Sequence, residues 1–334
     1  QLRLEVSGND LAEIGRPGGA ATLAAPPVAA IGERGTGLHD ELRAWERGAV
    51  TDRLGSRRTA MRRGAVGGAP VNQQAAPVPL VGATVPLRVI DLAPGNPDLC
   101  ANPLRRNGRV VAVTEHAILV EDVANPVSLT QTEVARIAAE YDELVHPVAV
   151  ENFGEPTDID SNGRVYIFMT SALNEMAARE GGGITVGFTF ALDLLPRQGP
   201  TEALSCAASN EGEIFYLIAP DPQGALGVPV SREAVFHFAT GIIAHELQHM
   251  INVGRRLYLV PDAEELEEVW LNEALSHMAE ELVFYRATGL NPRSDISWRT
   301  LTARGDVLEA YSRFARDNIS FYAEYLSNPA AESP

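Results

Sequence analysis

Apolar residues along the chain follow a strand period in some segments and a helix period in others. Apolar and β-branched residues alternate or run together in five short segments: VPLRVIDL (85–92), RVVAVTEH (109–116), AILVED (117–122), RVYIFM (164–169) and EIFYLIA (213–219). The glycine-rich EGGGITVGF (180–188) has the composition of a loop that enters a further strand. These patterns predict a β-sheet whose strands at 164–169 and 213–219 are buried.

Three segments have the helix period. Residues 128–145 begin with a capping box at Thr130, and their apolar residues then recur every three to four positions. A long apolar helix follows Ser231, which is a suitable N-cap. A third helix is predicted to begin at Asp262, again with capping-box spacing, and to continue through WLNEALSHMAEELVFYR (270–286). Together these elements predict an α+β fold, with a mixed, twisted sheet packed on the helix that follows Ser231.

The first 80 residues differ in composition from the rest of the chain. They contain the Gly-, Ala- and Pro-rich runs PGGAATLAAPPVAAIG and GAVGGAPVNQQAAPVP, and only LHDELRAWERGAVTDRL (38–54) predicts a helix. Because such a segment cannot bury a core of its own, we interpret residues 1–80 as a poorly ordered linker or pro-segment. The strands of residues 81–125 predict a small β unit, and residues 126–334 predict the main domain.

Composition and charge narrow the class of protein. The chain is 45% hydrophobic and 21% charged, which is typical of a soluble globular protein. Its formal net charge of -17 argues against binding to nucleic acid or to anionic membrane surfaces, since both require a cationic surface. No apolar run approaches the roughly 20 residues of a transmembrane helix, so we expect no membrane insertion. We also expect a monomer.

The segment IIAHELQHMIN (242–252) carries the candidate chemistry. His245 and His249 are four residues apart, so on a helix they lie on one face and both imidazoles can reach a single ion. Zinc suits this pair because it accepts nitrogen ligands in tetrahedral geometry. Glu246 is about 100° further round the helix, where it is poorly placed as a third ligand but well placed to act as general base on a metal-bound water.

A core helix that contains two histidines by chance is the alternative interpretation. The residues that flank the motif are apolar, and burying its polar side chains without partners would cost several kcal/mol, whereas a metal would satisfy them. A catalytic zinc needs a third protein ligand, and our candidate is Glu273, 24 residues after His249. Glu273 could instead belong to a solvated acidic face, but its nearest neighbours in WLNEALSHMAEEL (270–282) are largely apolar.

At these residues the sequence resembles the gluzincin metallopeptidases. HELQH (245–249) followed by NEALS (272–276) is similar to the two-helix signature of thermolysin and its relatives. Together with DIDSNGRVYIFM and SNEGEIFYLIAPDP, WLNEALSHMAEEL is more similar to the hyicolysin-type neutral zinc peptidases, which are secreted bacterial enzymes. The resemblance covers roughly residues 81–334. It implies a zincin-like fold and a secreted zinc endopeptidase, with His245, His249 and Glu273 as zinc ligands and Glu246 as catalytic carboxylate.

One position departs from the thermolysin pattern. Thermolysin has an Asp four residues after its ligand Glu, where it orients a zinc histidine, and the equivalent residue here is His277. A neutral imidazole can accept the same N–H bond but brings no negative charge. Asn272, next to Glu273, is the other candidate for contact with the metal ligands. The resemblance to an exported family also predicts that Cys100 and Cys206 form a disulfide, with two buried thiols as the alternative.

Two further sites stay open at the level of sequence. The donor for an oxyanion could be any of Tyr258, Tyr285, Tyr311, Tyr322 and Tyr325, or a residue beyond position 334, since the chain ends 61 residues past Glu273 and the domain could continue. DIDSNG (158–163) has the start of a calcium loop at Asp158, Asp160 and Asn162. The twelfth position is Met169 rather than Glu, so a tight Asx-rich turn is the alternative.

We therefore predict a secreted bacterial zinc endopeptidase that acts on protein or peptide substrates. Aminopeptidases that share the WLNE-like helix carry a G-x-M-E-N-type segment for the substrate amine, and its absence here favours cleavage within chains. Residues 180–188 or 213–219 could present a sheet edge to which the substrate adds as a further strand. The alternative from a different class is a non-catalytic cell-surface binding or adhesion module with a structural zinc site. A fourth protein ligand such as His277 would favour that module.

Overall fold

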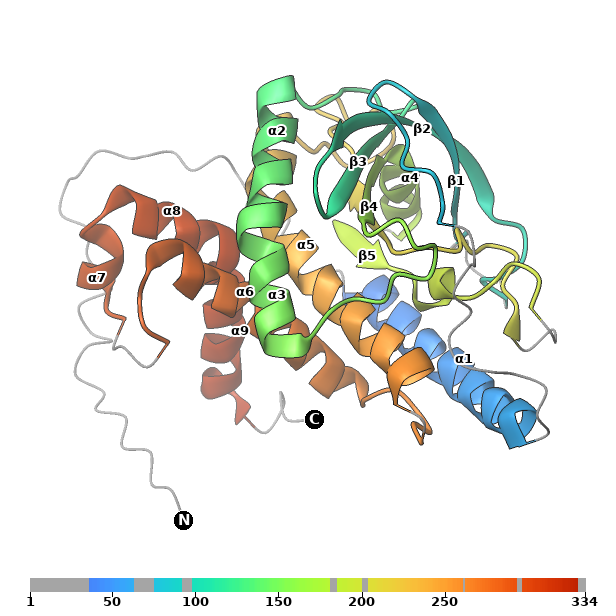
Figure 1. The fold of residues 1–334 in the computed structure, drawn as a ribbon. Helices are drawn as coiled ribbons and strands as arrows, with labels where there is room; N and C mark the ends of the chain where they lie inside the picture. The colour runs from blue at the N-terminus through green and yellow to red at the C-terminus, as the bar shows by residue number, and fades with distance from the viewer. Residues whose placement is uncertain are drawn as a thin grey trace, which may run out of the picture.

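The chain folds around one six-stranded sheet with helices packed against it (Figure 1). The computed structural model describes residues 36–62, 75–91, 98–180, 185–199, 204–260, 262–292 and 296–329. Within these ranges, the α+β class predicted from the sequence is confirmed. No helix of the described part is long and apolar enough to cross a membrane.

The sheet is mixed, with the strand order β1-β2-β3-β4-β6-β5. Its strands are β1 (Thr84–Val89), β2 (Leu104–Val113), β3 (Ala117–Asp122), β4 (Val165–Thr170), β5 (Gly187–Thr189) and β6 (Ile214–Ile218). The strands β1, β2 and β3 are antiparallel, β3, β4 and β6 are parallel, and β5 pairs antiparallel with β6. Each of the six segments predicted to contain a strand does contain one.

Two details of the sheet differ from the sequence-based picture. The strands of the predicted small β unit, residues 81–125, are half of this one sheet, because β3 pairs directly with β4. The predicted domain boundaries at residues 80 and 125 stay predictions. Of the two segments proposed as a free edge, 213–219 is wrong, because β6 lies between β4 and β5. Strand β5, from the segment 180–188, forms the edge.

Nine helices of the described part surround the sheet: α1 (Thr36–Arg62), α2 (Gln131–Glu140), α3 (His146–Phe153), α4 (Ser171–Glu180), α5 (Arg232–Gly254), α6 (Val269–Thr288), α7 (Trp298–Thr302), α8 (Gly305–Phe314) and α9 (Arg316–Ser327). Three short turns complete them: the π-helical η2 (Tyr141–Val145) and η5 (Arg255–Leu259), and the 3-10 helix η3 (Ala191–Leu194). Two predicted N-caps are confirmed. Thr130 forms its capping box with Glu133, and the Ser231 side chain accepts from the N–H of Ala234.

The third predicted helix begins later than expected. Helix α6 starts at Val269 and not at Asp262, and its N-cap Glu268 makes no side-chain capping bond. Acidic side chains of the preceding segment pair with arginines from other elements instead: Glu265 and Glu268 with Arg47, and Glu267 with Arg256. These tertiary ion pairs hold residues 262–268 in a non-helical connection, which overrides the local helix signal.

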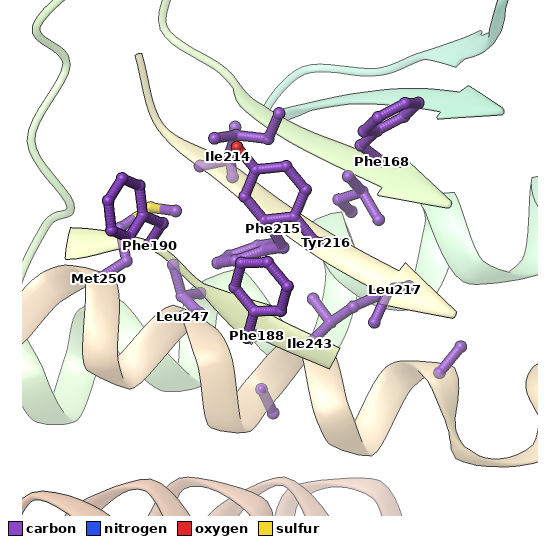
Figure 2. Close-up of a cluster of buried hydrophobic side chains, with 14 of the residues drawn as sticks. Phe168, Phe188, Phe190, Ile214, Phe215, Tyr216, Leu217, Ile243, Leu247 and Met250 are labelled. Atoms are coloured by element: carbon purple, nitrogen blue, oxygen red, sulfur yellow. The ribbon is translucent and has the colours of Figure 1, made fainter. Parts of the chain in front are cut away.

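Helix α5 packs one apolar stripe against the strands β5 and β6 (Figure 2). Ile243, Leu247 and Met250 lie on the sheet-facing side, with the spacing of one helix face, and all three are fully buried. Gly187 allows this close approach, because a Cβ there would lie 2.5 Å from the Ile242 side chain. The packing brings the edge strand β5 directly against the helix that carries the His-Glu motif.

Residues 36–62 differ from the poorly ordered segment that we predicted for residues 1–80. They form helix α1, whose Leu42, Val50 and Leu54 are buried in the main core. The helix is stable in this position because it buries one apolar face against the rest of the molecule, which composition alone did not indicate. Residues 1–35 and 63–74 of the predicted low-order segment lie outside the described residues, and residues 75–80 form neither helix nor strand.

Cys100 and Cys206 form the predicted disulfide. The bond joins the segment before β2 to the segment before β6, across 106 positions of sequence. Both cysteines are buried, and no cysteine is left free. The disulfide therefore ties the two halves of the sheet together covalently.

Candidate functional site

Helix α5 carries His245, Glu246 and His249 in its fourth and fifth turns, where the helix is enclosed. All three side chains are buried, and His249 is not exposed at all. The helix crosses α6, which supplies the facing side chains. His245 and His249 therefore face α6, and these buried polar side chains need partners there.

Potential metal-binding atoms of three side chains converge between α5 and α6. The Nε2 atoms of His245 and His249 are 3.1 Å apart. The Glu273 carboxylate places Oε2 at 3.3 Å from His245 Nε2 and Oε1 at 3.5 Å from His249 Nε2. Donor atoms of a tetrahedral zinc site lie about 3.3 Å apart, since each is about 2.0–2.1 Å from the ion. The spacing and chemistry of these three side chains therefore fit a zinc ion.

The other ring nitrogen of each histidine has its own partner. His245 Nδ1 is 2.7 Å from Glu280 Oε1, and His249 Nδ1 is 3.2 Å from Asn272 Oδ1. Such contacts fix the tautomer and make Nε2 the ring nitrogen that can bind a metal. Asn272 is itself held by an N–H from the Asn252 side chain at 2.9 Å. Both imidazoles are thus oriented toward Glu273.

Glu280 was not among the residues that the sequence singled out for this role. We expected His277 to orient a histidine ligand, but its ring lies beside that of His245, with centroids 4.9 Å apart, and its Nδ1 is 3.4 Å from Glu280. Glu280 provides the contact to His245 Nδ1 instead. Glu280 lies seven residues, or two helical turns, after Glu273, so both carboxylates are on one face of α6. This spacing in the sequence could have identified Glu280 as a partner of the site.

The electrostatics of the cluster favour a cation. Burial opposes protonation of His245, but the carboxylates of Glu273 and Glu280 outweigh burial and raise its pKa to about 10. Burial, reinforced by the charge of Arg43, lowers the pKa of His249. Burial also opposes ionisation of Glu280, yet hydrogen bonds with His245 and His277 lower its pKa overall. A bound divalent ion would supply the positive charge that these carboxylates attract.

Glu246 lies next to the converging atoms and faces the edge of the sheet. Its Oε2 accepts the backbone N–H of Thr189, in β5, at 2.7 Å. The Thr189 hydroxyl donates in turn to the backbone carbonyl of Glu246, at 3.2 Å. These bonds hold the carboxylate beside the edge strand.

Two residues of α1 also reach this site, and the sequence gave no sign of it. Arg43 Nη2 is 3.0 Å from Glu246 Oε2, its Nη1 donates to the Thr189 carbonyl at 3.0 Å, and its Nε is 3.7 Å from Glu273 Oε1. Glu46 accepts from Arg43 Nη1 at 2.6 Å and from the backbone N–H of Ala191 at 2.7 Å. Both side chains are buried. Apart from the Arg43–Glu46 pair, each of these contacts spans at least 145 positions of sequence, so no local motif marks them.

None of the candidate tyrosines has a described contact with the histidine pair or Glu246. The hydroxyl of Tyr258 donates to the backbone carbonyl of Leu194, and that of Tyr285 donates to Glu281 at 3.2 Å. Tyr322 and Tyr325 are exposed on α9, and Tyr311 is half-buried on α8. The assignment of an oxyanion donor among them stays open.

The predicted calcium ligands form a compact turn before β4. Asp158 Oδ1 accepts the N–H of Asn162 at 3.0 Å, and the Asn162 side chain donates to Asp160 at 2.6 Å. The Asn162 side-chain oxygen already accepts the N–H of Arg164. The third carboxylate beside Asp158 and Asp160 is Glu213. This is the Asx-rich turn that we considered as the alternative, and calcium at this turn stays a prediction.

Comparison with known proteins adds one relative. The chain is 27% identical over 212 residues to the neutral metalloprotease ShpI of Staphylococcus hyicus. The aligned residues make up 60% of this chain and 43% of that protein, so the chain spans less than half the length of this curated relative. No protein-family model matches the chain.

Proposed function

We propose that this chain is a metal-dependent peptidase whose active site lies between helices α5 and α6 and the edge strand β5. The convergence of His245 Nε2, His249 Nε2 and the Glu273 carboxylate within 3.1 to 3.5 Å of one another carries the proposal. Glu246 beside them supplies a base. The similarity to a neutral metalloprotease supports the same reaction class independently of this geometry.

The metal is zinc, held by His245, His249 and Glu273. Two imidazoles and one carboxylate are a donor set that catalytic zinc uses, with a fourth position for water or substrate. When bound, the ion lowers the pKa of its water toward about 7 and polarises the scissile carbonyl. Glu280 and Asn272 hold the two imidazoles in the required tautomer through their Nδ1 atoms.

Glu246 acts as general base and then as general acid. Its carboxylate takes the proton of the attacking water and passes it to the nitrogen of the leaving amine. The N–H of Thr189 orients the carboxylate for this step. Burial of the residue excludes competing solvent from the proton that it carries.

The substrate is a protein or peptide, bound as an extra antiparallel strand along β5. Strand β5 is the edge of the sheet next to Glu246, and main-chain hydrogen bonds to an edge strand give affinity without strong side-chain selection. The arrangement is of the gluzincin type and resembles that of the hyicolysin-type enzymes. Because the disulfide suits an oxidising compartment, we assign the protein to the outside of a bacterial cell, as a secreted monomer.

A binding module with a structural zinc is the competing function. It requires a closed site with a fourth protein ligand. His277, the residue considered for that position, contacts Glu280 and the ring of His245, on the side of Nδ1 rather than of the converging Nε2 atoms. This geometry favours the enzyme.

Metal analysis combined with casein hydrolysis tests the proposal. Because Arg43 pairs with Glu246, hydrolysis is measured on the intact chain and on chain from which α1 has been separated by proteolysis. We expect about one zinc per chain and hydrolysis that a chelator abolishes and added zinc restores. Zinc bound tightly in a protein that cleaves no peptide in either form would favour the binding module.

A further inference from the structure

Helix α1 lies across the candidate active site and is anchored on both sides of it. It packs against α6 and against η3, which directly follows the edge strand (Figure 1). On the β5 side, the ring of Trp45 stacks on that of Phe190, with centroids 6.2 Å apart. On the α6 side, Arg47 pairs with Glu265 and Glu268 at 3.0 and 2.7 Å. Arg43 and Glu46, on the same stretch of α1 as these anchors, are the residues that enter the site.

Arg43 engages the groups that catalysis requires. Its guanidinium pairs with Glu246, the proposed base, at 3.0 Å and lies 3.7 Å from the Glu273 carboxylate. Arg43 is buried, and its guanidinium also lies 2.6 Å from the carboxylate of Glu46. The guanidinium occupies the Glu246 oxygen that would take a proton from water.

The same helix engages the backbone of the substrate-binding edge. Arg43 donates to the carbonyl of Thr189, and Glu46 accepts the N–H of Ala191. Val186 bonds to β6 and backbone groups alternate along a strand, so those of Thr189, the last residue of β5, face away from β6. Ala191 begins η3 directly beyond this end of the edge strand. A peptide strand added there needs these groups. Its binding and the seating of α1 are therefore mutually exclusive.

The two side chains form a pair that can be withdrawn together. Arg43 and Glu46 are three positions apart on one helix and are already bonded to each other at 2.6 Å. When α1 leaves the site, Arg43 and Glu46 can stay paired with each other in water. Neither charge then has to move between the buried site and water without a partner. Glu246, the Thr189 carbonyl and the Ala191 N–H are then released for catalysis and substrate binding.

We propose that α1 is an inhibitory segment of this chain, which keeps the peptidase latent by occupying the catalytic carboxylate and the edge strand at once. The inference rests on the proposed function and adds its regulation. Activation requires hydrolysis of a peptide bond between α1 and β1, which consumes one water and creates a new carboxyl and a new amino terminus. The freed α1 then dissociates from the site.

The test uses the whole, folded chain with the recognition sequence of a specific protease inserted between residues 63 and 74. Casein hydrolysis is measured on the zinc-loaded protein intact and after cutting and dilution to about 1 µM. A tethered segment has an effective concentration of about millimolar, so dilution lowers it about a thousandfold, and activity should rise at least tenfold. An intact chain as active as the cut and diluted chain would overturn the proposal.

Synthetic peptides of residues 36–62 give a matched comparison. The parent peptide should inhibit the cut protein, and its Arg43→Gln variant should need at least about tenfold higher concentration, as lost charge-assisted bonds predict. Arg53→Gln is the control, because Arg53 lies on the same helix and contacts Ala49 and Cys100 rather than the site. Equal inhibition by all three peptides would contradict a role for Arg43. So would an intact Arg43→Gln chain that is less active than the intact parent.

Hydrogen exchange separates this proposal from the proposed function. The amide of Ala191 is bonded to Glu46 of α1, so its exchange should accelerate when the cut α1 is diluted away, in the parent or in its Arg43→Gln form. If exchange accelerates and the peptides rebind in the expected order while no form cleaves casein, the inhibitory contact stands and the peptidase function fails. If every form cleaves casein equally, the function stands and latency fails.

Discussion

The imidazole of His245 is joined to Glu280 by a 2.7 Å contact at Nδ1, which directs its Nε2 toward His249 and Glu273. A carboxylate in this position fixes the ring and makes it a more basic ligand. The contact links two residues 35 positions apart, on the crossing helices α5 and α6. It gives Glu280 a specific role in metal affinity.

Glu280→Gln should therefore weaken zinc binding by about 10- to 100-fold, which is typical of losing a partner of a metal-bound histidine. The amide keeps the size of the side chain but not its charge. Zinc affinity is measured by competition with a chromogenic chelator. Glu281→Gln is the control, because Glu281 is the next residue in the sequence and its carboxylate accepts a hydrogen bond from Tyr285. Equal zinc affinity in the two variants would remove this role from Glu280.

Glu273→Ala should abolish tight zinc binding, because two histidines alone hold the ion weakly. A bound metal stabilises the folded state, and the stabilisation grows with the logarithm of the ratio of free metal concentration to the dissociation constant. The parent should therefore melt at a lower temperature after chelation, whereas the melting temperature of Glu273→Ala should not respond to the chelator. A variant that still binds zinc tightly would place the third ligand elsewhere, with Glu280 and His277 as the next candidates.

Replacing Cys100 and Cys206 together by Ser should lower the free energy of unfolding by about 2–5 kcal/mol, the usual effect of losing a disulfide that closes a long loop. Urea unfolding of the parent and the double variant measures the difference. Parent protein unfolded in reductant should match the double variant. Titration that finds two free thiols in the denatured, unreduced parent would contradict the bond itself.

Glu213 predicts a specific dependence of stability on pH. Burial, partly offset by bonds from Thr157 and Ile159, raises its pKa from 4.5 to about 8. The folded state therefore holds a proton that the unfolded state has released between about pH 4.5 and 8, so this residue makes folding less favourable as pH rises through that window. Glu213→Gln should remove this effect. The difference in free energy of unfolding between the variant and the parent should therefore be more favourable to the variant at pH 8 than at pH 5.

Chemical denaturation at the two pH values checks this shift. Glu143→Gln, at an exposed position of η2, is the control and should leave the difference between pH 5 and pH 8 as in the parent. A Glu213→Gln variant with the parent's pH dependence would show that this carboxyl titrates normally in the folded protein.

Local signals in the sequence were enough to predict much of the fold. Capping residues Thr130 and Ser231 begin their helices because their side chains bond to backbone N–H groups a few positions away. The spacing of His245 and His249 likewise depends only on helix geometry. The start of α6 was mispredicted because ion pairs with Arg47 and Arg256, distant in sequence, hold the preceding acidic segment.

Contacts of long range set the rest of the candidate site. The edge position of the three-residue strand β5 depends on its pairing with β6, which follows it in sequence but is internal in the sheet. Arg43 and Glu46 are ordinary residues of an amphipathic helix until α1 docks on the site. Their roles follow from the docking of the helix, for which a single sequence carries no local pattern.

The Glu246→Gln variant tests the central claim most directly, because it separates metal binding from catalysis. The amide keeps the size of Glu246 and can still accept the N–H of Thr189, but it cannot take a proton from water. Measured on protein freed of α1, zinc should stay at about one per chain, and casein hydrolysis should fall by about 10²–10⁴-fold. A variant that retains zinc and is as active as the parent would contradict the peptidase account.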